Sequence, residues 1–119
     1  MISISEGARQ VDIFTLKNND AVEISADEIK MNIDGEAVCF KIAEILKIAI
    51  LTSNQGPFVD DVALAITIED RVFVILSENK LFEKFLFDGI SKKITIDFQK
   101  VMEASSCTEN AEFIIYHKY

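Results

Sequence analysis

The residues that could supply nucleophilic chemistry are Cys107 and the single histidine, His117. A thiol beside an imidazole can act as a nucleophile–base pair. Such a pair also needs a third group to orient the imidazole and a site for the oxyanion, and a histidine close to a chain end is poorly held. The sequence therefore favours a buried thiol and an exposed imidazole over a catalytic dyad.

Metal-binding patterns fail on ligand chemistry. Aligning Gly35 with the sixth position of a calcium loop puts Lys30 at the first ligand position and Lys41 at the twelfth, where carboxylates are required. Asp60 and Asp61 offer oxygen ligands, but adjacent residues of a strand point to opposite faces. The chain contains no HExxH motif and no paired CxxC motif. We therefore expect no metal site.

Motifs for cofactor binding and general catalysis are missing from the sequence as well. The four glycines are isolated from one another, so no glycine-rich loop can cradle a phosphate, and no GxSxG motif occurs. Twenty acidic residues could supply paired carboxylates for acid–base catalysis, but nothing in their spacing selects a pair. We predict a protein without cofactors that is not an enzyme.

The acidic residues are unevenly distributed. Between Asn18 and Glu36 lie six acidic residues and one base, Lys30, which give −5 of the chain's −8. Such a field favours a basic protein partner and disfavours direct contact with nucleic acid or with an anionic membrane. A solvated strand face with its turns would give the same pattern. The residues predicted to contact the partner are Asp20, Glu23, Asp27, Glu28, Asp34, Glu36, Asp60, Asp61 and Phe58.

Aromatic residues near this acidic stretch could anchor an interface, because interface cores favour aromatic side chains. Phe58 follows Gly56-Pro57, and Phe14 lies in a first hairpin predicted from the strands at residues 11–16 and 22–24 and the turn at residues 17–20. A place in the hydrophobic core is the alternative for both.

Alternation of apolar and polar residues predicts strands in the first part of the chain. We expect strands over residues 11–16 and 22–24, followed by a hairpin over residues 29–40. Asp34-Gly35 lies at the centre of that hairpin, and Asp-Gly suits a type I′ turn because both central residues need positive φ.

Residues 41–51 fit a helical stripe and a strand alternation equally well by spacing. Their β-branched content and the stop at residues 53–57 favour a strand, preceded by a turn around Ala43–Glu44. A second hairpin is expected over residues 62–76, turning at Glu69-Asp70, and its apolar density places it centrally in the sheet.

The pattern then changes to helical. Ser77 is predicted to cap a helix over residues 78–87 that Gly89 ends, and Thr95 to cap a second helix over residues 96–104. The second helix is expected to bury Phe98, Val101 and Met102.

A last apolar run over residues 113–116 predicts a final strand. The order of elements indicates an α+β fold: a mainly antiparallel sheet of about six to seven strands, hairpins first, with two helices in the C-terminal half and a final strand. A chain of 119 residues, half of them apolar and without a linker, predicts a single domain over residues 1–119. No signal peptide or apolar run long enough to cross a membrane is evident, so we expect a cytoplasmic protein with two buried, reduced thiols, Cys39 and Cys107. Its oligomeric state is left open.

The C-terminal stretch resembles the tail of a group of small uncharacterised bacterial proteins. Residues 104–113 match the pattern A-x-x-C-T-E-N-x-x-F, and the strand pair over residues 61–76 fits the same layout. A phenylalanine–aspartate turn precedes the helix in that group, whereas the order here is Asp97-Phe98. The resemblance implies no chemistry, only a hydrogen-bonded turn around Thr108–Asn110.

At the level of protein class, the chain is similar to bacterial immunity proteins, which are small, often acidic and free of catalytic motifs. The similarity implies a domain that occludes a basic, nuclease-like toxin with an acidic surface. The alternatives are a small pleckstrin-like adaptor or ligand-binding module, and an enzyme with scattered carboxylates.

Overall fold

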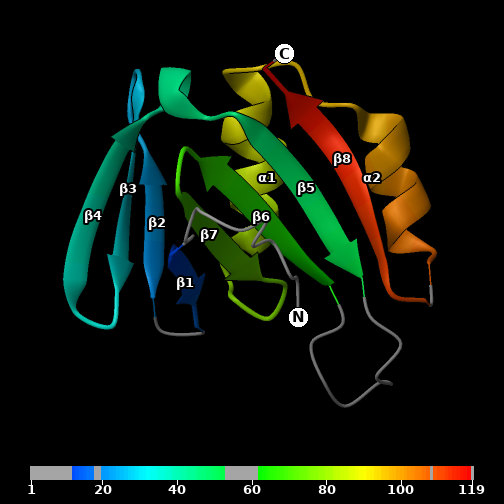
Figure 1. The fold of residues 1–119 in the computed structure, drawn as a ribbon, viewed down its shortest axis with the longest axis horizontal. Coiled ribbons are helices and arrows are strands. Elements are labelled where there is room, and N and C mark those ends of the chain that lie inside the picture. Colours follow the sequence, from blue (N-terminus) through cyan, green and yellow to red (C-terminus); the bar gives the residue numbers. More distant parts are fainter. Residues whose placement is uncertain (1–11, 18–19, 53–61, 108, 119) are drawn as a thin grey trace.

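The computed structural model describes residues 12–17, 20–52, 62–107 and 109–118. These residues form a mixed α+β fold with strands in two sheets, mostly antiparallel, two α-helices in the C-terminal half and a final strand (Figure 1). The fold class predicted from the sequence is confirmed.

Eight strands are present in the described residues. They are β1 (Asp12–Leu16), β2 (Ala21–Ile24), β3 (Glu28–Ile33), β4 (Glu36–Lys41), β5 (Lys47–Thr52), β6 (Val62–Ile68), β7 (Arg71–Leu76) and β8 (Ala111–His117). The helices are α1 (Phe82–Asp88) and α2 (Phe98–Ser105), with short 3-10 turns η1 (Ile42–Glu44) and η2 (Ile90–Lys92).

The larger sheet has the strand order β1-β7-β6-β5-β8. The β6–β7 hairpin lies inside it, as expected, and β8 pairs antiparallel with β5 at one edge. The expectation that Phe14 belongs to a first hairpin is wrong, because β1 pairs with β7 in parallel, with Phe14 opposite Phe73. The strand next to β1 in sequence is in the other sheet.

The smaller sheet is a meander in the order β2-β3-β4. Its β3–β4 hairpin turns at Asp34 (φ 56°) and Gly35 (φ 88°), so the predicted type I′ turn forms. The ambiguous stretch after β4 resolves as the 3-10 turn η1 followed by strand β5, the alternative that the β-branched residues favoured.

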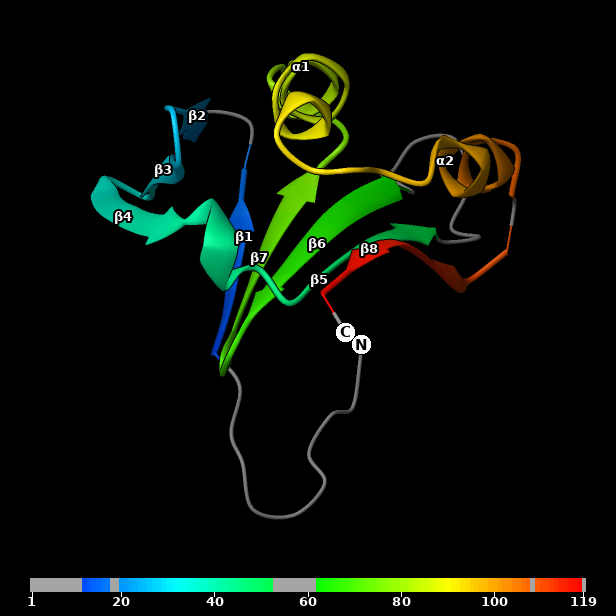
Figure 2. The ribbon, with the colours of Figure 1, turned by 90° about the horizontal axis from the view of Figure 1, so that it is seen from above.

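Both helices cover the same face of the larger sheet, and the smaller sheet stands beside β1 (Figure 2). The buried residues of the described segments form one hydrophobic core that joins these layers. Phe73 of β7 stacks on Phe14 of β1 at 5.1 Å between ring centroids and on Phe40 of β4 at 4.9 Å. This aromatic stack connects the two sheets.

The first helix begins later than predicted, at Phe82. Ser77 does not cap it: the Ser77 N–H donates to the carbonyl of Val62, and residues 77–81 form turns. Asn79 holds these turns. Its side chain is 2% exposed, accepts from the Leu81 N–H at 2.9 Å, and donates to the carbonyls of Lys17 (2.6 Å) and Asp20 (3.0 Å). Residues 77–81 therefore hold the β1–β2 connection in place and do not extend the helix. Gly89 ends the helix as expected.

The second helix also begins later than predicted. Asp97, and not Thr95, is its N-cap, and the Asp97 carboxylate accepts from the Lys100 N–H at 3.2 Å. Val101 is buried, but Phe98 and Met102 are 41% and 70% exposed, so the expectation that they are buried is wrong.

Candidate partner-binding surface

The smaller sheet presents one face to the core and the other to solvent, because side chains alternate along a strand. Val22, Ile29, Met31 and Phe40 point inward and are buried. The outward face carries Glu23 on β2, Glu28, Lys30 and Asn32 on β3, and Ala37, Cys39 and Lys41 on β4.

The carboxylates on this outward face lie opposite lysines. Glu23 is opposite Lys30 in the β2–β3 register, and Glu28 is opposite Lys41 in the β3–β4 register. Cross-strand neighbours of opposite charge attract each other across the ladder. The middle of the face is therefore balanced in charge.

The remaining predicted acidic residues lie at the two ends of the smaller sheet. Asp34 is in the β3–β4 turn, Glu36 follows it, and Asp20 lies beside them. The Asp20 carboxylate accepts from the N–H of Lys17 at 2.9 Å and of Asp34 at 3.0 Å. The two backbone donors, of which the Lys17 N–H has the larger effect, hold the pKa of the Asp20 carboxyl below its ordinary value. The Asp20 carboxylate thus stabilises the fold through these hydrogen bonds, whereas Asp34 and Glu36 are exposed.

At the opposite end, Asp27 occupies the β2–β3 turn and is exposed, and its carbonyl accepts from the Ile42 N–H at 2.9 Å. Glu44 in η1 accepts from the Lys41 N–H at 3.3 Å. Desolvation, followed by the charge and hydrogen bond of the Glu28 carboxylate, raises the pKa of the Cys39 thiol. The structure therefore separates the six acidic residues into two ends and a balanced face.

The net charge of the smaller sheet and its turns, residues 20–44, nevertheless differs from that of the other described residues. Residues 20–44 hold seven carboxylates and two lysines, a net −5. The other described residues hold ten acidic and nine basic side chains, a net −1. Phe58, Asp60 and Asp61 lie outside the described residues.

The candidate Cys107–His117 dyad does not form. The Thr52 hydroxyl bonds to the Cys107 thiol at 3.6 Å at one end of β5, while His117 is opposite Lys47 at the other end. The two ends are about 16 Å apart for a strand of this length. Cys39 is exposed and Cys107 is half-buried, which corrects the expectation of two buried thiols. Among the described residues, no group of His, Cys, Asp and Glu could hold a metal ion.

An apolar patch on the helices was not predicted. Phe87 at the end of α1 is 50% exposed and stacks on Phe98 of α2, with ring centroids 6.0 Å apart, and Met102 lies one turn beyond Phe98. The sequence carried a signal for it. Phe98 and Met102 form one stripe at i,i+4 spacing, Val101 and Ala104 form another at i,i+3 spacing, and only one stripe of so short a helix can face the sheet.

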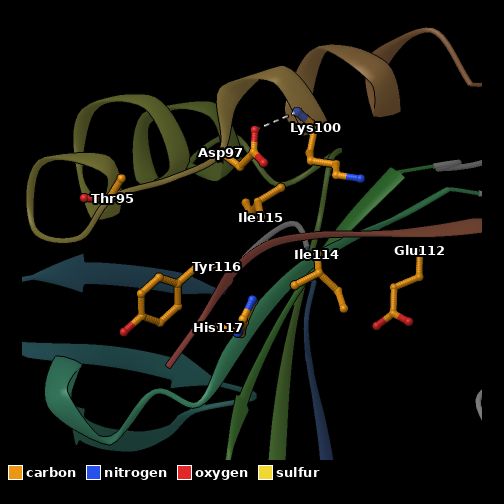
Figure 3. A pocket seen from close by; sticks show the side chains of 8 residues that line it. All are labelled: Thr95, Asp97, Lys100, Glu112, Ile114, Ile115, Tyr116 and His117. Atoms are coloured by element: carbon orange, nitrogen blue, oxygen red, sulfur yellow. Dashed lines mark hydrogen bonds between the residues drawn. The ribbon is translucent and has the colours of Figure 1, made fainter. Parts of the chain in front are cut away.

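A shallow groove of about 820 Å³ runs along β8 beside the start of α2 (Figure 3). Strand β8 has a bulge opposite Ile48 and Ala49. Ile115 points toward the helices and is buried, while Ile114 lies on the other side of the strand (Figure 3). The Ile115 carbonyl accepts from the Asp97 N–H at 2.9 Å and so fixes the start of α2. The groove is lined by Thr95, Asp97, Lys100, Glu112, Ile114, Ile115, Tyr116 and His117.

The closing motif of the chain has a structural role where it is described. The Glu109 carbonyl accepts from the Thr52 hydroxyl at 2.6 Å and from the Cys107 thiol at 3.6 Å, which ties the connection after α2 to the end of β5. Thr108, part of the predicted turn, lies outside the described residues.

Comparison of the chain with protein-family models, with curated proteins and with solved structures finds no match. None of the helices in the described part of the chain is long and apolar enough to cross a membrane.

Proposed function

We propose that this chain is a non-enzymatic protein-binding domain that recognises a basic protein through its smaller sheet. The observation that carries the proposal is the division of charge, with a net −5 on residues 20–44 and a net −1 on the other described residues. A nearly neutral body does not cancel the field of this unit. The field therefore attracts a cationic surface over about one Debye length, roughly 8–10 Å at ordinary salt.

The partner that this chemistry fits is a nuclease-like toxin domain, and the chain would act as its immunity protein. A domain that holds nucleic acid needs cationic side chains for the phosphates. The carboxylates of Asp27, Asp34 and Glu36 can form ion pairs with those cationic side chains, while the bulk of the sheet blocks access to the nucleic-acid site of the toxin. Inhibition by occlusion requires no catalytic group in the inhibitor.

Co-expression with a basic, toxin-like protein encoded next to this chain tests the proposal. We expect wild type to restore growth and to bind the purified toxin domain with an affinity that falls as salt rises. Continued full toxicity in the presence of the folded chain would disprove the immunity function.

A pair of triple variants with the same change in charge tests the surface. Asp27→Asn/Asp34→Asn/Glu36→Gln removes three carboxylates from the ends of the smaller sheet, and Glu69→Gln/Glu83→Gln/Glu103→Gln removes three exposed ones elsewhere. We expect the first to weaken binding about tenfold or more, since three contacts of about 0.5–1 kcal/mol add to that much, and the second to weaken it less than threefold. Equal losses would mean that only the overall charge matters.

The groove along β8 supports a second candidate function, a small ligand-binding module. Its lining offers the polar side chains of Asp97, Lys100 and His117 beside apolar ones such as Ile114, and ligand sites combine apolar walls with a few polar groups. A screen of small metabolites by thermal shift, with Lys100→Ala as the control, tests this function. A ligand that stabilises wild type and the Lys100→Ala variant equally would place binding elsewhere.

A further inference from the structure

Strand β4 forms the outer edge of the smaller sheet. Its only partner among the described strands is β3, and Figure 1 shows its other side facing away from the body of the protein. A free edge presents backbone N–H and C=O groups that can pair with another extended chain.

The register identifies which backbone groups of β4 are free. The two-residue type I′ turn makes Ile33 and Glu36 a hydrogen-bonded pair, and such pairs alternate along an antiparallel ladder. Glu36, Val38 and Phe40 therefore direct their backbone groups toward β3. Ala37 and Cys39, both exposed, direct theirs toward the free side.

The charges around this edge specify the kind of chain that fits. Asp34 and Glu36 lie at one end of β4, and Asp27, Glu28 and Glu44 lie at the other. The bases nearby are Lys41, opposite Glu28, and Lys30, opposite Cys39. The two acidic ends are about 17 Å apart along the strand, the length of some five residues. Between them the edge is uncharged at Ala37, Val38 and Cys39.

We propose that an extended basic segment of the partner adds to β4 as a fourth, antiparallel strand of the smaller sheet. The segment carries a basic residue at each end, about five to seven residues apart, and uncharged β-branched residues between them. Its backbone pairs with Ala37 and Cys39, and its terminal cations meet the two acidic ends of the sheet. This inference rests on the proposed function, because it specifies how the acidic sheet would hold a basic protein.

The test uses the full chain, labelled with ¹⁵N, and a capped seven-residue peptide with Lys at both ends and alternating Val and Thr between them. We expect slowed hydrogen exchange at the Ala37 and Cys39 amides when the peptide is present. The Ala37→Pro variant removes the outward N–H without touching the β3 ladder, and the dissociation constant should rise about tenfold or more. Ala37→Val keeps the N–H and should bind within about twofold of wild type.

Peptides with methylated amides give a second measurement that needs no variant of the protein. One peptide is N-methylated at its second, fourth and sixth residues, and another at its third and fifth. Only one of these sets can face β4, so we expect one peptide to lose binding and the other to keep it. Equal binding by both, or equal binding by Ala37→Pro and Ala37→Val, would overturn the inference.

The outcomes separate this inference from the proposed function. One outcome is that the peptide does not slow hydrogen exchange in β4, while the triple variant of Asp27, Asp34 and Glu36 still binds the toxin domain more weakly than wild type. In that case the acidic sheet binds a basic protein by another geometry. Protection of Ala37 and Cys39 that depends on protein concentration, without peptide, would show pairing between two copies of the chain and would also overturn the inference.

Discussion

Asn79 attaches the β1–β2 connection, which links the two sheets, to the start of α1. Its buried amide makes three hydrogen bonds, two of them to carbonyls of the β1–β2 connection. Loss of the side chain would leave these groups without their partners in a place that water reaches poorly.

We therefore expect Asn79→Ala to lower the free energy of unfolding by about 2–4 kcal/mol, at roughly 1 kcal/mol for each hydrogen bond plus desolvation. Asn32→Ala, on the exposed face of β3, is the matched control and should cost less than about 0.5 kcal/mol. Urea unfolding measures both. Similar values for the two variants would mean that the hydrogen bonds of Asn79 do not stabilise the fold.

Asp20 should make stability depend on pH. In the folded protein the pKa of the Asp20 carboxyl lies below its ordinary value of 3.8. The stability that the ionised Asp20 adds is therefore complete above pH 3.8 and is lost as the pH falls through the lower pKa of the folded protein. Asp20→Asn should thus be less stable than wild type near neutral pH, and the difference should shrink in acid. Urea unfolding at about pH 6 and about pH 3 measures this, with Glu23→Gln as the control for loss of one exposed carboxylate. A difference that is constant with pH would contradict the assignment.

At the scale of elements, the strands were predictable and the helix starts were not. Alternation depends only on residues that are close in sequence, and Asp34-Gly35 by itself favours the positive φ angles of its turn. The start of α1 depends on Asn79 reaching Lys17, some sixty residues away in sequence, and no local pattern reports that contact. The parallel pairing of β1 with β7 and the division into two sheets have the same long-range origin.

The candidate site was predictable only in part. Counting charges located the acidic segment, but only the strand register shows that Glu23 and Glu28 lie opposite lysines. The exposed Phe87–Phe98 pair was missed because Phe98 was expected to be buried together with Val101 and no position was predicted for Phe87.

The contact between α1 and β2 depends on Gly89 having no side chain. A Cβ at this position would lie 2.7 Å from Ile24 Cδ1 and 2.8 Å from the Phe85 carbonyl oxygen. We expect Gly89→Ala to destabilise the protein by about 1–3 kcal/mol through this overlap.

The double variant Gly89→Ala/Ile24→Val tests that cause. It removes one of the two clashes, so it should lose less stability than the sum of the single variants. Thermal unfolding of the four proteins gives the coupling. Simple additivity would show that Ile24 does not limit the space at Gly89.

At the scale of the whole molecule, charge is divided between an acidic small sheet and a nearly neutral body. Like charges within each end of the small sheet repel one another, and at low salt the two ends, about 17 Å apart, repel each other as well. The triple variant Asp27→Asn/Asp34→Asn/Glu36→Gln should therefore melt at a higher temperature than wild type at about 10 mM salt, and the gain should fall at about 0.5 M, where the Debye length is only a few ångströms. The Glu69→Gln/Glu83→Gln/Glu103→Gln control should gain less. A gain that does not change with salt would have a cause other than repulsion.

The pairing of β1 with β7 has a consequence for how the chain matures on the ribosome. The β2-β3-β4 meander has all its strands within residues 21–41 and can assemble as soon as they emerge. Strand β1 precedes the other described strands but has no neighbour in its own sheet until residues 71–76 appear, and β5 gains its second neighbour only when β8 appears. The acidic meander can thus take shape before the larger sheet that supports it is complete.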